Sequence, residues 1–124
     1  MNGLEILKEA WGLREGPAVF TTVDKNSVPN SVYVLGMKLL EDGRIAIIDN
    51  YFQKTRENIK NGSKGSFLFL AKPRKPYQAK GSIEYLTSGP VYEDLRASVD
   101  PKHPRVAAAV LRVEELYSGS ERLI

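Results

Sequence analysis

Five segments rich in β-branched and aromatic residues follow one another along the chain, and short turns separate most of them. Apolar segments of this length, bounded by Gly, Pro, Asn and Asp, are typical of β-strands. The Asp-Gly pair at residues 42–43 predicts a hairpin, so the sheet should be mostly antiparallel. A closed barrel is the economical way to hide the edges of such a sheet. The five segments are residues 18–23, 30–40, 44–48, 65–71 and 77–87.

Two amphipathic segments predict helices at the periphery of the sheet. Residues 2–13 begin with Asn2, a good N-cap, and Glu5 follows three positions later as in a capping box. A second helix should begin near Pro90, because proline favours the first helical turn. Each segment carries one apolar stripe at helical spacing, made by Leu4, Leu7 and Trp11 in the first and by Val91, Leu95 and Val99 in the second.

Residues 106–117 are ambiguous by local pattern. Three alanines, Leu111 and two glutamates favour a helix by intrinsic propensity. Val106, Val110, Val113 and Tyr117 also fit a helical stripe. The spacing of Leu111 and Val113 fits a strand only weakly, so propensity alone predicts a helix here.

Residues 45–62 predict the most informative local unit, which is a strand, a loop and the start of a helix. Four apolar residues are followed by Asp49 and Asn50, both of which favour turns. Thr55 offers an N-cap oxygen for a polar helix that ends at residues 61–62 (Asn-Gly). Free backbone N–H groups and a positive dipole end at such a start suit a phosphate, and Lys54 and Arg56 flank it.

Length and composition indicate one ordinary globular domain over residues 1–124. The formal net charge of +3 permits an anionic ligand without demanding nucleic acid. Cysteine is absent, which excludes disulfides and thiolate chemistry. No signal peptide opens the chain and no apolar run approaches the ~20 residues of a membrane span, so we expect a cytoplasmic protein. The single histidine, His103, cannot build a metal site by itself.

The order of these segments resembles the pyridoxamine 5'-phosphate oxidase-like FMN-binding split barrels, especially the small single-domain members. The resemblance runs through AVFTT, VPNSVYV, IAIID, QKTREN, GSFLFL and KGSIEY, and it returns weakly at AVLRVE. It implies a mainly β fold, a six-stranded and mostly antiparallel split β-barrel with a few short peripheral helices. It also makes residues 107–116 the last barrel strand, against the helix that propensity favours.

The resemblance further implies a homodimer with FMN at the subunit interface and a role as an oxidoreductase or electron carrier that serves a redox partner. The phosphate would lie at Lys54 and Thr55. The loop along the ribityl chain and ring would be Asp49, Asn50, Tyr51, Phe52 and Gln53, and the strand beside the ring would supply Ser31, Val32 and Tyr33. No catalytic residue is indicated, and the substrate-binding arginine and histidine of the longer vitamin B6 oxidases have no match.

Two alternatives stay open. The small FMN-binding proteins have a glycine pair where this chain has Asn50 and Tyr51, so the same fold could hold another planar cofactor, such as a deazaflavin or haem. The second alternative is a nucleic-acid-binding barrel, because the basic residues Lys72, Arg74 and Lys75 lie close in the sequence to two tyrosines, Tyr77 and Tyr85. The mild net charge argues against nucleic acid.

Overall fold

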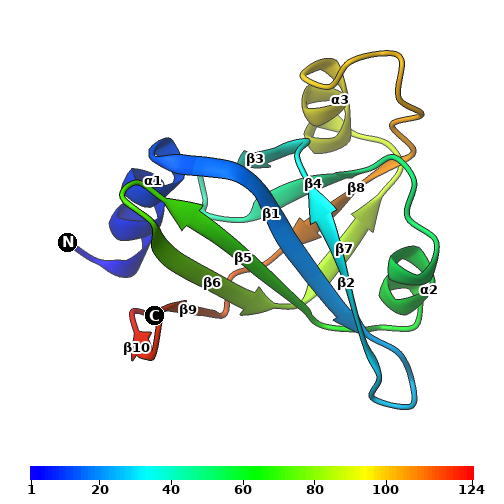
Figure 1. The fold of residues 1–124 in the computed structure, drawn as a ribbon. Coiled ribbons are helices and arrows are strands. Elements are labelled where there is room, and N and C mark those ends of the chain that lie inside the picture. Colours follow the sequence, from blue (N-terminus) through cyan, green and yellow to red (C-terminus); the bar gives the residue numbers. More distant parts are fainter.

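A computed structural model describes residues 1–124 as two antiparallel β-sheets with three helices around them (Figure 1). The larger sheet contains β1 (Arg14–Val23), β2 (Pro29–Val34), β5 (Gly65–Ala71), β6 (Lys75–Gly81), β9 (Glu115–Ser118) and β10 (Glu121–Arg122). The smaller sheet contains β3 (Met37–Leu39), β4 (Ile45–Asp49), β7 (Ile83–Leu86) and β8 (Ala107–Leu111). The helices are α1 (Gly3–Gly12), α2 (Lys54–Lys60) and α3 (Pro90–Ala97).

The predicted mainly β, antiparallel split barrel is confirmed. The strand orders are β10-β9-β6-β5-β1-β2 and β3-β4-β8-β7, and every pairing is antiparallel. The two sheets do not join into one closed barrel, so β2 is left as an edge strand of the larger sheet. This free edge is where the candidate site lies.

Three of the six predicted strands are each divided in two and the short β10 is added, so the structure contains ten strand segments rather than six. Residues 107–116 divide at 112–114, between β8 and β9. Residues 30–40 divide at Leu35–Gly36 and residues 77–87 divide at Ser82, where the chain passes from one sheet to the other. Close packing requires glycine at these crossings. A Cβ on Gly36 would lie 2.4 Å from Ile48 Cγ2, and one on Gly81 would lie 1.7 Å from the Arg112 carbonyl oxygen.

Of residues 107–116, which the family resemblance makes the last barrel strand, 107–111 form β8 and 115–116 begin β9 in the other sheet, and the helix favoured by propensity is wrong. Strand β8 lies between β4 and β7 with all five residues buried. Ala109 and Leu111 face the main core, while Ala108 and Val110 pack with Leu95 under α3. The alanines therefore serve a strand that is covered on both faces, and this tertiary packing outweighs their helical propensity.

The helices close the structure around these sheets. Trp11 of α1 stacks on Phe67 with ring centroids 5.7 Å apart and meets Phe69 edge-on at 5.6 Å, so α1 covers the core side of β5. The cap that the sequence predicts for α1 is present, because Asn2 Oδ1 accepts from the Glu5 N–H at 2.9 Å. None of the three helices has the length and hydropathy needed to cross a membrane.

Candidate functional site

A cleft of about 670 Å³ opens beside the free edge of β2. One wall is β2, the floor is the loop that follows β4, and the far wall is the loop that follows α3. Five of the ten residues predicted for cofactor binding line this cleft. They are Val32, Tyr33, Asn50, Tyr51 and Phe52. The structure therefore brings together, on one cavity, predicted residues from segments about twenty positions apart.

Asp49 is fully buried and holds the floor of the cleft in place. Its Oδ1 accepts from the Phe52 N–H at 3.0 Å and from Arg56 Nη2 at 3.0 Å. Its Oδ2 accepts from Arg56 Nε at 2.8 Å and from the Tyr85 hydroxyl at 2.5 Å. Because all four contacts are to protein groups, we assign Asp49 to positioning the loop rather than to touching a ligand.

The Asp49 carboxylate also shifts the ionisation of its partners. Its hydrogen bonds raise the pKa of Arg56 above the usual range. Burial, followed by the hydrogen bond to Asp49, raises the pKa of Tyr85 to about 12. A phenolate beside a buried carboxylate would be repelled, so the neutral phenol is the form that the fold stabilises.

Replacing Tyr85 with Phe should lower the free energy of unfolding by about 1 kcal/mol at neutral pH, because one hydrogen bond to a buried carboxylate is lost. The raised pKa of Tyr85 predicts that its contribution is complete below pH ~10, the unfolded value, and lost as the pH rises toward about 12. Urea unfolding of wild type and variant between pH 8 and 12 should show the two curves converging. Tyr33→Phe, at an exposed tyrosine, is the control. A difference that stays constant with pH would contradict the assignment.

The loop after α3 holds the outer wall of the cleft. Asn50 Oδ1 accepts from the Arg105 N–H at 3.0 Å, so this oxygen is engaged and the amide N–H₂ group remains free for a ligand. The Tyr51 hydroxyl lies 3.2 Å from His103 Nδ1, and the two rings meet edge-on at 5.9 Å. His103 thus belongs to the cleft, although its place in the sequence, between Lys102 and Pro104, predicts only an exposed loop residue.

The predicted helix start needs one correction. Helix α2 begins at Lys54 with Gln53 as its N-cap, and no side chain caps it. Thr55 lies inside the helix and is buried, and its Oγ1 accepts from Asn30 Nδ2 at 3.1 Å. The Thr55 hydroxyl is drawn to β2 because an unpaired buried oxygen would be costly. Thr55 therefore ties α2 to β2 and is not an N-cap.

Lys54 stands outside the cleft lining, on the exposed side of α2. Its Nζ lies 3.7 Å from both Asp24 Oδ2 and Glu57 Oε1, and its side chain is 46% exposed. Pairs of this length at an exposed site contribute little, so the ammonium is available to a stronger anion. Gln53 is also exposed.

Ser31 and Tyr33 point to the opposite side of β2 from Asn30 and Val32, because side chains alternate along a strand. They lie on a face of the larger sheet that we call the open face, since no helix covers it. One row across the strands of this face contains five residues side by side: Tyr33, Val19, Leu68, Gln78 and Tyr117. Ser31 Oγ and Thr21 Oγ1 share a hydrogen bond of 2.7 Å in the next row. The β2 residues thus belong to two faces, while the cleft runs along the edge between them.

A family model described as pyridoxamine 5'-phosphate oxidase matches residues 8–118. The chain belongs to the pyridoxamine 5'-phosphate oxidase family. An uncharacterized protein of Methanocaldococcus jannaschii is 31% identical over 110 residues, which cover 84% of this chain and 74% of that protein. These comparisons confirm the family that the sequence resembles.

Solved structures share the fold of this family member at low identity. An FMN-binding protein from Syntrophomonas wolfei is 21% identical with a TM-score of 0.81, over 94% of this chain and 88% of that one. The HupZ protein of Group A Streptococcus is 24% identical with a TM-score of 0.78, over 96% and 95% of the two chains. A heme binding protein from Mycobacterium smegmatis is 13% identical with a TM-score of 0.73, and the match covers 98% of this chain and 57% of that one.

In this member of the pyridoxamine 5'-phosphate oxidase family, the two tyrosines that motivate the nucleic-acid alternative make contacts within the fold. Tyr77 is buried and stacks on Phe69 with ring centroids 5.5 Å apart. The Tyr85 hydroxyl is bound to Asp49. The Tyr77 ring is buried and the Tyr85 ring is packed, partly buried, against the main core, so neither gives the basic loop at residues 72–75 an exposed platform for base stacking.

Proposed function

We propose that the chain is an FMN-binding flavoprotein that acts as an oxidoreductase or an electron carrier. The observation that carries the proposal is the cleft at the edge of β2, with aromatic and apolar walls, in a chain of the pyridoxamine 5'-phosphate oxidase family. Its volume of about 670 Å³ is in the range of cofactor sites, and apolar walls with a few polar groups suit an isoalloxazine ring. The shared fold of an FMN-binding protein supports the same reading.

The polar groups next to the cleft fit the rest of the cofactor. Lys54 would supply a positive charge to the phosphate in exchange for its long contacts with Asp24 and Glu57. Ser31 and Asn30 lie on the neighbouring strand, and the bond from Asn30 to Thr55 fixes α2 at that strand. The free amide of Asn50 and the unpaired edge of β2 would provide hydrogen bonds for the ring.

The open face supports a homodimer in the same proposal. Four apolar residues of this face are exposed, namely Val23, Tyr33, Leu68 and Leu70. Tyr33 is the most exposed of the four, at 78%. Tyr33 and Leu68 flank Val19 in one row, and exposed apolar side chains gathered on an uncovered sheet face suit an interaction surface. A second copy on this face would meet Tyr33 at the rim of the cleft, so both subunits would enclose one cofactor.

The bound flavin would supply hydride or single-electron transfer. The residues of the chain would bind it, orient its ring against β2 and restrict water at the cleft. Phe52 is buried at the floor, and its backbone N–H is held by Asp49. This fixed floor would set the position of the ring in the cleft.

Replacing Lys54 with Ala should weaken FMN binding by about tenfold, because one charge-assisted contact with the phosphate is lost, and should leave riboflavin unchanged. Flavin fluorescence titrations on the purified dimer or monomer measure both. Lys64→Ala is the matched control, since Lys64 pairs with Glu114 on another part of the surface. Equal losses for FMN and riboflavin would remove the phosphate role of Lys54. A colourless wild-type protein that takes up no FMN would contradict the function itself.

Haem is the second candidate, because His103 and Tyr51 on the cleft wall are the residue types that ligate haem iron. The heme binding protein with the same fold supports this candidate. The absorption spectrum separates the two cofactors: bound oxidised FMN has one broad near-ultraviolet band and one broad blue band, whereas haem is dominated by one intense Soret band. His103→Ala should abolish a haem spectrum, whereas the variant should still take up FMN, weakened only by the loss of the contact that holds Tyr51.

A further inference from the structure

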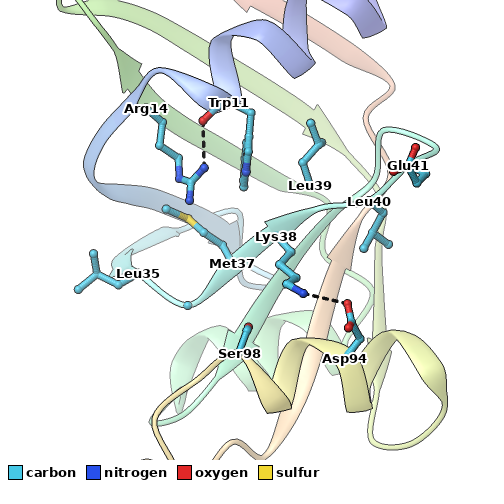
Figure 2. Close-up of a pocket in the computed structure, with 11 residues that line it drawn as sticks. Trp11, Arg14, Leu35, Met37, Lys38, Leu39, Leu40, Glu41, Asp94 and Ser98 are labelled. Carbon is cyan, nitrogen blue, oxygen red and sulfur yellow. Dashed lines mark hydrogen bonds and ion pairs between the residues drawn. The ribbon is translucent and has the colours of Figure 1, made fainter.

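A second cleft, of about 580 Å³, lies on the other side of the Leu35–Gly36 link. Its walls come from the end of α1, the start of β1, strand β3 and helix α3 (Figure 2). The lining is mixed: five of its eleven residues are apolar, among them Leu35, Met37 and Leu39, and the rest include Arg14, Lys38, Glu41 and Asp94. None of the residues predicted for cofactor binding lines this cleft, and the proposed flavin function makes no use of it.

Arg14 is the unusual group in this cleft. Its guanidinium carbon lies 4.4 Å above the centroid of the Trp11 ring, and Nη1 donates to the Trp11 carbonyl oxygen at 3.0 Å. No ion pair joins it to an acidic side chain, although it is half-buried. Burial lowers the pKa of Arg14, which is the sign of a desolvated charge without a counter-ion. A bound anion would offset that cost.

The other charges of the cleft are already engaged or fully exposed. Figure 2 shows Lys38 pointing away from Arg14 toward Asp94 of α3, and their Nζ and Oδ2 atoms are 3.0 Å apart. Glu41 projects into solvent and approaches Lys8 only at 4.0 Å. Arg14 is therefore the single cation that remains for a ligand.

A smaller hollow of about 420 Å³ shares Trp11, Arg14, Leu35 and Met37 with the main cleft. The stacked pair of Arg14 and Trp11 thus lines both hollows. Stacking on the indole fixes the plane of the guanidinium, so its remaining N–H groups form a rigid fork of the kind that pairs with a carboxylate.

We infer that Arg14 and Trp11 form a second ligand site, which binds the carboxylate of a small amphipathic molecule whose apolar part lies against Leu35, Met37 and Leu39. The negative charges of Glu41 and Asp94 on the lining oppose a polyanion, so a monocarboxylate is favoured over a polyphosphate. The site does not rest on the proposed flavin function, although Leu35 also lines the first cleft, and it would exist if another planar cofactor were bound there.

The test uses Trp11, the only tryptophan of the chain, as its own reporter. The full-length protein as purified is titrated with octanoate, 1-octanol and octylamine, which share a chain length and differ in charge. Trp11 fluorescence and titration calorimetry follow binding. We expect octanoate to bind about tenfold or more tightly than the other two, because only octanoate pairs with Arg14. Equal affinities, or no response to any of the three, would overturn the inference.

Two variants locate the charge that is responsible. Arg14→Gln should remove the preference for octanoate and leave octanol binding and FMN binding unchanged. Lys38→Gln, the control at the other cation of the cleft, should keep the preference. Retained octanoate preference in Arg14→Gln, or its loss in Lys38→Gln, would contradict the role of Arg14. If Arg14→Gln does not fold, the comparison of the three probes on the wild-type protein still decides the outcome.

Discussion

Replacing Asp49 with Ala is expected to lower the free energy of unfolding by about 3–5 kcal/mol. The carboxylate is 0% exposed and accepts from Arg56, Tyr85 and the Phe52 backbone. Its removal leaves the Tyr85 hydroxyl and the Phe52 N–H without partners and separates three elements, β4, α2 and β7. Urea denaturation, followed by circular dichroism, measures the loss.

The same variant should lose FMN binding as well, since the loop at residues 50–52 would no longer be held as the floor of the cleft. Asp42→Ala is the matched control: its carboxylate pairs with Arg44 Nε at 2.9 Å but is largely exposed, so the cost should stay below about 1 kcal/mol. A double-mutant cycle with Arg56→Ala separates the pair energy from the rest. An Asp49→Ala protein as stable as the Asp42→Ala protein would show that the network does not hold the loop.

Local signals in the sequence identify most elements of the fold. Turn residues and β-branched runs place the central strands, and Asn2 caps α1 as expected. The errors arise where distant packing decides. The alanines of β8 read as helix because nothing local reveals that β4 and β7 lie on either side of them. The long strands break at Gly36 and Ser82 because close contacts with Ile48 and the Arg112 backbone accompany the change of sheet.

The local sequence likewise reveals some features of the candidate site and not those that depend on distant contacts. The loop after β4 is recognisable because a buried strand runs directly into turn residues. Three contacts that shape the cleft join residues far apart in the chain, namely Asn30 with Thr55, Asp49 with Tyr85, and Tyr51 with His103. A polar residue with a distant partner has the same local pattern as a solvated one. The sequence therefore does not identify His103 or Asn30 as residues of the cleft region, and its prediction of Thr55 as a cap is wrong.

Replacing Leu68 with Glu should convert the proposed homodimer into a monomer and weaken FMN binding with it. Leu68 lies between Val19 and Gln78 in the middle of the open face, and it is 42% exposed. A carboxylate there would be buried without a partner in both subunits, so the dimer should dissociate at least about a hundredfold more readily. Analytical ultracentrifugation across a concentration series measures the equilibrium.

Ile124→Glu gives the matched comparison, because Ile124 is 41% exposed but packs near Gly3 at α1 rather than on the open face. It should leave both assembly and flavin binding unchanged. Measuring both the monomer–dimer equilibrium and the FMN affinity tests the proposed interface separately from the proposed cofactor site. A Leu68→Glu monomer that still binds FMN at wild-type affinity would place the whole cofactor site within one subunit. A Leu68→Glu protein that remains a dimer would exclude the open face as the interface, and the role of Tyr33 at the cofactor would then depend on its own subunit alone.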